Sequence, residues 1–172
     1  MKNYKPTRYY KDIFSIDYKK LQDEGIKCLI FDLDNTLALL HEKECPDKTK
    51  ELIKRLQDDF IIFIISNNTA SRIEPYKKSL GIDAVSLAMK PFTIGLRRIK
   101  NKYKLKKKEM VMIGDQLVTD IISGKNFNIK TILVDPLGNK DLKITKLNRK
   151  IEDIIVKRYV KKGIFKRGKY YE

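Results

Sequence analysis

Histidine, cysteine and long apolar runs are scarce in this sequence, and each shortage excludes a class of protein. His41 is the only histidine, so no His-based catalytic triad or zinc cluster is available beyond it, and we expect His41 at the surface near the site. Two cysteines, Cys28 in an apolar run and Cys45 in a loop, cannot form a disulfide framework and are expected to be reduced thiols. The longest apolar run, residues 60–65, is far too short to span a bilayer.

Several targeting and binding signals are also missing. Residues 1–11 lack the apolar core of a secretory signal. Neither the Gly-x-x-x-x-Gly-Lys phosphate loop nor the Gly-x-Gly-x-x-Gly dinucleotide fingerprint occurs. With 42% hydrophobic and 35% charged residues among 172, the chain has the composition of a soluble protein with one ordinary domain. We therefore predict a cytoplasmic protein, with a peripheral position at the inner face of the membrane left open by its charge.

Acidic residues are outnumbered, since 22 Asp and Glu face 38 Lys and Arg, which gives a net charge of +16. The excess is uneven: residues 97–108 hold eight basic residues and no acid, and residues 140–172 hold twelve basic residues against four acids. Such patches attract nucleic acid, anionic lipid headgroups or small phosphate esters. A solvated surface explains the same charge runs, because charge alone specifies no partner.

Five short apolar runs alternate with helix-length segments. Several runs are continuous in Ile, Val, Leu and Phe, which is typical of strands covered on both faces. This alternation predicts an α/β protein of Rossmann-like type, with a parallel five-stranded sheet and helices on both faces. The predicted strands lie at 26–31, 60–65, 84–88, 110–113 and 131–134, and the predicted helices at 47–57, 69–80, 93–103 and 120–126.

The predicted domain covers residues 25–160. Residues 1–24 carry weaker signals and are expected to form an arm packed on the core, with a helix at 18–23. A terminal amphipathic helix is expected at 142–160, and residues 161–172 are expected to form a basic, frayed tail. The apolar face of that terminal helix is predicted to consist of Leu147, Ile151, Ile154 and Ile155.

Polar clusters follow four of the predicted strands. The clusters are Asp32-Leu33-Asp34-Asn35-Thr36, Ser66-Asn67-Asn68, Lys90 before Pro91, and Gly114-Asp115 with Asp120 further on. In open parallel sheets, functional groups gather at the carboxyl ends of the strands. Each cluster alone has a plainer explanation as a turn, a helix cap or a solvated lysine. All four in this order on one rim indicate a single site.

The chemistry that these residue types suit is phosphoryl transfer. Asp32 and Asp34 are two residues apart, so their side chains point the same way wherever the strand geometry continues. Together with Asp115 they would repel one another unless a cation lay among them, and oxygen ligands favour Mg²⁺. The metal and Lys90 would neutralise the substrate phosphate, so that an anionic nucleophile can approach phosphorus.

Asp32 is the predicted nucleophile, which would form an aspartyl-phosphate. Asp34 would protonate the leaving oxygen and then take a proton from the hydrolytic water. Ser66 and its neighbouring backbone amides would hold the phosphoryl oxygens. Asp120 would hold metal-bound water or orient Lys90.

A calcium loop is the main alternative interpretation of the first cluster. The EF-hand register requires Gly at position 37 and Glu at position 43, and this chain has Leu37 and Lys43 instead. The calcium-loop interpretation is therefore not supported.

These motifs resemble those of the haloacid-dehalogenase (HAD) phosphatase superfamily, and more narrowly its subclass IIIA members of the YqeG type, related to phosphatidylglycerophosphate phosphatases. The matching segments are FDLDNT, SNN, MKP and GDQLVTD, within a resemblance that covers roughly residues 8–156. Where relatives tend to carry Gly-Gly-Asn-Arg, this chain has Ser123-Gly124-Lys125-Asn126.

The resemblance implies a role for each matching residue. It makes Asp32 the nucleophile and Asp34 the acid/base, and it assigns the magnesium ion to Asp32, the Asp34 carbonyl and Asp115. The implied phosphate ligands are Ser66, Asn67 and Lys90, and the implied supporting residues are Thr36, Asn68, Gly114 and Asp120.

The spacing of the motifs leaves no room for the cap domain that encloses small substrates in many HAD enzymes. Only 23 residues separate Thr36 from Phe60, and 23 separate Ser66 from Lys90. An uncapped rim favours a large or surface-bound substrate. We therefore predict a Mg²⁺-dependent phosphomonoester hydrolase that acts on phosphatidylglycerophosphate and contacts an anionic membrane.

Other functions remain open at this point. A HAD phosphatase could instead act on a nucleotide, a sugar phosphate or a phosphoprotein. Phospho-receiver domains also accept phosphate on Asp, but they lack a second Asp two residues later, and Asp34 argues for turnover. A non-catalytic nucleic-acid-binding module is supported by the charge alone.

Overall fold

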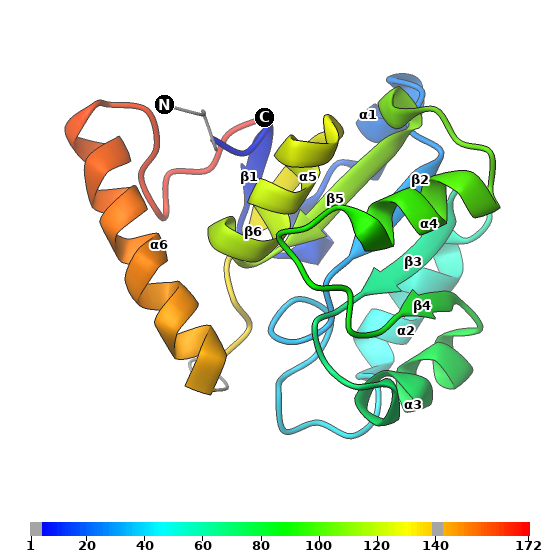
Figure 1. Ribbon diagram of the computed structural model, residues 1–172. Coiled ribbons are helices and arrows are strands. Elements are labelled where there is room, and N and C mark those ends of the chain that lie inside the picture. The colour runs from blue at the N-terminus through cyan, green and yellow to red at the C-terminus, as the bar shows by residue number, and fades with distance from the viewer. Residues whose placement is uncertain (1–4, 139–142) are drawn as a thin grey trace.

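The computed structural model describes residues 5–138 and 143–172 (Figure 1). Its centre is a parallel sheet in the order β1-β6-β5-β2-β3-β4. The predicted α/β class and parallel sheet are confirmed, but the sheet has six strands rather than five. The strands are β1 (Arg8–Tyr10), β2 (Cys28–Phe31), β3 (Ile61–Ile65), β4 (Asp83–Val85), β5 (Met110–Gly114) and β6 (Lys130–Val134).

The strand missed in the sequence is β1, which lies in the segment expected to be an arm. It pairs in parallel with β6, in the register Arg8 to Ile132 and Tyr10 to Val134. The three residues Arg-Tyr-Tyr form no apolar run, so the sequence pattern does not predict a strand there. Tyr9 is nonetheless fully buried at this edge of the sheet.

Helices cover both faces of the sheet (Figure 1). Helices α1, α2 and α3 pack on one face, where β2 contributes Leu29 and Phe31. Helices α4 and α5 pack on the other face, where β2 contributes Cys28 and Ile30. Burial of both faces explains the uninterrupted apolar runs. The α-helices are α1 (Tyr18–Asp23), α2 (Asp47–Leu56), α3 (Ala70–Leu80), α4 (Ile94–Lys102), α5 (Ile122–Phe127) and α6 (Lys143–Lys161). Two short 3₁₀ helices, η1 (Ile13–Ser15) and η2 (Lys107–Glu109), and a π-helix, η3 (Leu117–Ile121), complete the set among the described residues.

The connections at the carboxyl ends of the strands are short, as the motif spacing predicts. Between β2 and β3 the chain forms a loop and α2, and between β3 and β4 it forms α3 alone. No cap domain is present among the described residues. The described part of the chain also contains no helix that is both long and apolar enough to cross a bilayer.

The C-terminal segment differs from the expected frayed tail. Phe165 and Tyr159 are buried against Tyr9. The backbone of Tyr171 exchanges two hydrogen bonds with that of Tyr9, at N–O distances of 2.8 and 3.0 Å. The last residues are therefore part of the folded structure, because tyrosines of both termini pack together.

The apolar face predicted for the terminal helix is also partly wrong. Ile151 and Ile154 of α6 are exposed, at 42% and 62%. Ile155 contacts the core as predicted, together with Tyr159, which was not in the predicted face. The side chain of Leu147 lies outside the described residues.

Both cysteines are buried free thiols. Burial raises the pKa of Cys28 to about 12 and that of Cys45 to about 11. Both therefore stay protonated at neutral pH and are poor nucleophiles, which agrees with structural roles. His41 is exposed, as predicted.

Candidate active site

The candidate site lies where the strand order reverses. Strand β2 is flanked by β3 on one side and β5 on the other, and the chain proceeds outward from β2 in both directions. At such a switch point the loops that follow adjacent strands diverge and leave a crevice at their carboxyl ends. Asp32 follows directly after β2, and its backbone amide donates to the carbonyl of Ile113 at 2.9 Å. Its position is therefore fixed by the sheet itself.

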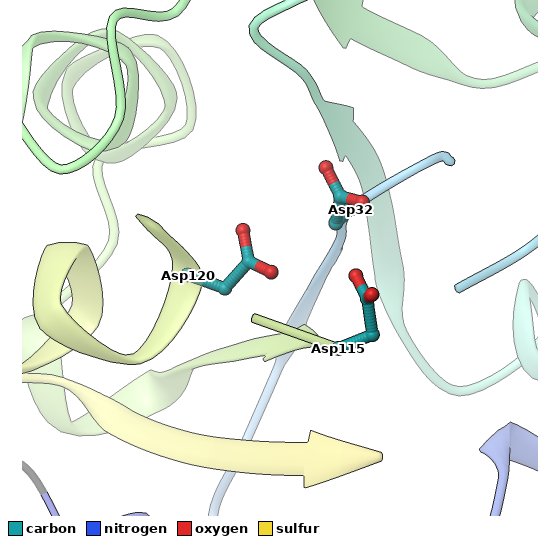
Figure 2. Close-up of side chains that lie close together, drawn as sticks. All are labelled: Asp32, Asp115 and Asp120. Atoms are coloured by element: carbon teal, nitrogen blue, oxygen red, sulfur yellow. The ribbon is translucent and has the colours of Figure 1, made fainter. Parts of the chain in front are cut away.

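Three carboxylates meet at the carboxyl ends of these strands (Figure 2). One carboxylate oxygen each of Asp32, Asp115 and Asp120 lies within 4.8 Å of the others. Asp32 is 6% exposed, and Asp115 and Asp120 are fully buried. The side chain of Asp120, expected only in a supporting role, belongs to this cluster, whereas that of Asp34 does not.

Lys90 is the cation that faces this cluster. Its Nζ donates to Asp32, to Oδ1 of Asp120 at 2.7 Å and to the carbonyl of Ile65 at 3.1 Å. Burial lowers the pKa of Lys90, but the carboxylates of Asp120 and Asp32 outweigh it, so the pKa lies above its ordinary value. Lys90 therefore stays protonated and pairs with two of the three acids.

Burial raises the pKa of Asp32 well above its usual range, and the neighbouring Asp120 and Asp115 raise it further, against the opposing effect of Lys90. Three carboxylates thus face one ammonium group in a site with little access to water. Such an excess of buried negative charge is stabilised by a further cation.

The donor set fits a hard divalent cation. All three clustered side chains offer carboxylate oxygen, which suits Mg²⁺ or Mn²⁺ better than metals that prefer nitrogen or sulfur. Among the described residues, Asp32, Asp115 and Asp120 are the side chains close enough to one another to take part in holding such an ion.

Asp34 has partners of its own. Its Oδ1 accepts hydrogen bonds from Nε and Nη2 of Arg72, at 3.0 and 2.8 Å, and its Oδ2 accepts one from Asn68 at 3.2 Å. Strand β2 ends at Phe31, and Asn35 has a left-handed backbone with φ of 64°. The alternation expected to align Asp32 with Asp34 therefore does not continue, and the two carboxylates have separate partners.

Arg72 is a site residue that the sequence pattern did not identify. It lies in the first turn of α3 and also donates from Nη2 to the carbonyl of Leu39 at 3.0 Å. The only sequence signal is a basic residue shortly after Ser66-Asn67-Asn68. Arg72 joins the loop after β2 to α3 and holds the Asp34 carboxylate in place.

The second polar cluster organises the backbone around Lys90. Asn67 accepts from the amide of Lys90 at 2.7 Å and donates to its carbonyl at 3.0 Å. Ser66 is buried, and its hydroxyl accepts from the amide of Asn68 at 3.1 Å. Thr36 donates to Oδ1 of Asp115 at 3.3 Å. The sequence-predicted residues are thus brought to one rim, with Asn67 linking two of the motifs.

The C-terminal segment also reaches the site. Nη2 of Arg167 donates to the carbonyl of Asp115 at 3.3 Å and to the carboxylate of Glu152. Glu152 is 2% exposed and accepts from the amide of Leu117 at 3.2 Å. These contacts support the loop that carries Asp115, and no local sequence signal predicts them.

Gly114 is required by the close approach of Asp120. A Cβ at position 114 would lie 2.3 Å from Oδ2 of Asp120. We expect Gly114→Ala to lower the free energy of unfolding by about 2 kcal/mol, because the buried Asp120 must move. Urea unfolding measures the loss, and titration with Mg²⁺ should show weaker binding.

The matched control is Gly95→Ala, whose Cβ would approach Cδ1 of Ile65 at 2.6 Å in the apolar core. This variant should lose stability without losing Mg²⁺ affinity. Equal Mg²⁺ affinity in both variants would contradict the role given to Gly114.

The fold and the site define a class of protein, a phosphatase of the HAD type. Two family models match the chain: haloacid dehalogenase-like hydrolase over residues 29–90 and HAD-hydrolase-like over residues 88–155. The "Probable phosphatase YqeG" of Bacillus subtilis (strain 168) is 36% identical over 162 residues, covering 92% of both chains. The chain belongs to the HAD-like hydrolases and, within them, to the YqeG phosphatase family, which favours an enzyme over a receiver or an idle binding module.

More distant relatives share the same resemblance. Phosphatidylglycerophosphate phosphatase 1 of Arabidopsis thaliana is 26% identical over 90% of this chain, and that of Chlamydomonas reinhardtii is 24% identical over 89%. The chain spans 47% and 61% of the length of these two proteins.

Solved structures support the fold. A protein from Listeria monocytogenes serotype 4b has a TM-score of 0.54 at 21% identity, covering 68% of this chain and 85% of its own. The cobalt-bound deoxy-D-mannose-octulosonate 8-phosphate phosphatase from Haemophilus influenzae has a TM-score of 0.53 at 18% identity, covering 85% and 95%.

Proposed function

We propose that this phosphatase is a Mg²⁺-dependent phosphomonoester hydrolase that works through an aspartyl-phosphate on Asp32. The observation that carries the proposal is the position of Asp32 at the switch point of the sheet, beside Lys90, Asp115 and Asp120. A carboxylate held rigidly next to cationic partners can approach an anionic phosphate.

In the first step, Oδ of Asp32 forms a bond to phosphorus and the bond to the leaving oxygen breaks. Asp34 gives its proton to that oxygen. In the second step, Asp34 takes a proton from water, the water oxygen bonds to phosphorus, and the Asp32–phosphorus bond breaks to release phosphate. Ser66, Asn67 and Lys90 hold the phosphoryl oxygens throughout.

A magnesium ion would be held by Asp32, the Asp34 carbonyl and Asp115, with Asp120 beside them, and it would neutralise phosphate charge. Lys90 would supply the second positive charge. Its pairing with Asp120 holds the ammonium at the site before the substrate arrives.

Asp34→Asn tests the division of labour between the two aspartates. We expect kcat/KM for an alkyl phosphate, which reports the first step, to fall about 10³-fold, because its leaving oxygen requires a proton. An aryl phosphate with an acidic leaving group should lose much less kcat/KM. Steady-state kinetics on both substrates measure the difference, and equal losses of kcat/KM would contradict the acid role of Asp34.

Arg72→Gln serves as the companion variant. It keeps the Asp34 carboxylate but removes its two hydrogen bonds from the guanidinium. We expect a smaller loss of kcat, about tenfold, because Asp34 remains able to exchange its proton but is less well oriented.

We propose phosphatidylglycerophosphate as the substrate. Supporting observations are the similarity to two phosphatidylglycerophosphate phosphatases, the short connections around the site and the net charge of +16. The protein would then be cytoplasmic, with peripheral contact at the inner face of the membrane.

A panel of phosphoesters with Mg²⁺ tests the substrate, using phosphatidylglycerophosphate, a nucleoside monophosphate, a sugar phosphate and a phosphopeptide. The highest kcat/KM is expected for the lipid. Inactivity on the lipid with rapid hydrolysis of another member would overturn this assignment.

A further inference from the structure

Exposed apolar side chains are concentrated beside the active site. Four of the large exposed apolar side chains lie between Leu87 and Ile94, a stretch that we call the 87–94 segment. Among the described residues, the exposed large apolar side chains are Leu87, Met89, Phe92, Ile94, Leu137, Ile151, Ile154, Val160 and Tyr170. A group of exposed large apolar side chains of this kind marks an interaction site.

The 87–94 segment surrounds the lysine of the site. Lys90 points inward to Asp32 and is 6% exposed, whereas Met89 and Phe92 on either side are 58% and 63% exposed. Leu87 is 63% exposed and Ile94 is 50% exposed. The apolar side chains therefore border the place where a substrate phosphate must enter.

Hydrogen bonds hold this segment in an ordered conformation. The amides of Leu87 and Ala88 donate to the carbonyls of Asn68 and Ser66, each at 3.0 Å. The amide of Phe92 donates to the carbonyl of Met89 at 2.9 Å. Because the backbone is tied to the second polar cluster, the outward direction of the apolar side chains is a property of the fold.

Leu137 extends the apolar border on the loop after β6. It is 41% exposed, and its amide donates to the carbonyl of Asn35 at 2.9 Å, which places it beside the loop that carries Asp34. The site is therefore bordered by apolar residues from two separate loops.

Basic residues follow the 87–94 segment along the chain. Residues 84–98 contain Lys90, Arg97 and Arg98 and no acidic residue. Arg97 and Arg98, in the first turns of α4, are both exposed. Apolar side chains flanked by exposed cations suit the interface of an anionic bilayer, where the apolar groups enter the acyl boundary and the cations meet lipid phosphates.

We propose that the 87–94 segment docks the enzyme on anionic lipid bilayers, with Leu87, Met89, Phe92 and Ile94 in the interfacial layer. This inference rests on the proposed function for its substrate, since docking here turns the site toward phosphates in the headgroup layer. A lipid-borne phosphomonoester then reaches Asp32 without leaving the bilayer.

Flotation with vesicles tests the docking, using phosphatidylglycerol mixed with phosphatidylcholine and phosphatidylcholine alone. Wild type should float with the anionic vesicles only. The double variant Phe92→Ser/Ile94→Ser should lose about tenfold in partitioning, because two apolar anchors are removed. Arg97→Gln/Arg98→Gln should weaken binding more at low salt than at high salt.

The matched control is Ile154→Ser on α6, where an equally exposed apolar residue lies outside the 87–94 segment. It should float like wild type. Circular dichroism and hydrolysis of a water-soluble aryl phosphate should be unchanged in Phe92→Ser/Ile94→Ser, because neither residue contacts the reacting atoms.

Three results would overturn the docking proposal: no flotation of wild type, equal flotation of Phe92→Ser/Ile94→Ser and wild type, or self-association of wild type that the double variant abolishes. The last would show that a second copy of the chain covers the patch. Hydrolysis of vesicle-borne phosphatidylglycerophosphate separates this proposal from the substrate assignment. If the double variant loses flotation and wild type does not hydrolyse that lipid, docking is supported and the substrate assignment is wrong. If wild type and the double variant hydrolyse that lipid equally well, the substrate assignment is supported and the docking proposal is wrong.

Discussion

Replacing Asp32 by Asn is expected to lower kcat about 10⁴-fold or more on every phosphoester that the enzyme accepts. An amide oxygen is a far weaker nucleophile than a carboxylate, and no aspartyl-phosphate can form. Asn has nearly the same shape, so the site should keep its structure. The effect should therefore appear in kcat at saturating substrate, and raising the Mg²⁺ concentration should not restore it.

The folding of the variant separates this loss from damage to the site. Asp32→Asn removes one of three clustered buried carboxylates while Lys90 stays paired with Asp120, so without metal its free energy of unfolding should equal or exceed that of wild type. Asp47→Asn, at a side chain 92% exposed on α2, should leave both kcat and stability unchanged. Retention of wild-type kcat by Asp32→Asn would remove Asp32 from the mechanism.

Replacing Lys90 by Met is expected to damage both catalysis and stability. The ammonium is 2% exposed and pairs with Asp32 and Asp120. Met preserves the length of the side chain but leaves both carboxylates without their cation, which costs about 3 kcal/mol of stability. The loss of positive charge at the phosphate should lower kcat about 10³-fold.

Urea unfolding with and without Mg²⁺ measures how much of the stability depends on the positive charge of Lys90. Because Mg²⁺ can replace part of the missing charge, it should stabilise Lys90→Met more than it stabilises wild type. Lys102→Met is the matched control: that lysine pairs with Asp83 at 2.5 Å but is 59% exposed, so its loss should change stability far less than the loss of Lys90. Equal stability of the two variants without Mg²⁺ would contradict the buried ion-pair network.

Local patterns were sufficient to predict the central strands and the residues at their ends. Burial on both faces produces the continuous apolar runs of β2, β3 and β5, and each run ends directly before Asp32, Ser66 or Asp115. Because all strands are parallel, one rim collects these groups regardless of how the loops are built.

Features that depend on packing between distant segments were not predictable from local patterns. Strand β1 pairs with β6, and its Tyr9 packs against the C-terminal tyrosines. Arg72 and Arg167 reach Asp34 and the Asp115 carbonyl from other parts of the chain. Asp32 and Asp34 have separate partners because β2 ends at Phe31, before either aspartate. The sequence pattern does not define that boundary.

The most direct test of the central claim is to locate the phosphorylated residue. The Asp34→Asn variant, mixed with an aryl phosphate and Mg²⁺, should accumulate the intermediate, since hydrolysis of the aspartyl-phosphate lacks its base. After acid quenching, borohydride reduction converts an aspartyl-phosphate to homoserine, and peptide mass spectrometry locates the homoserine in the sequence. We predict homoserine at position 32 alone; homoserine at another aspartate, or turnover with none at position 32, would contradict the covalent mechanism.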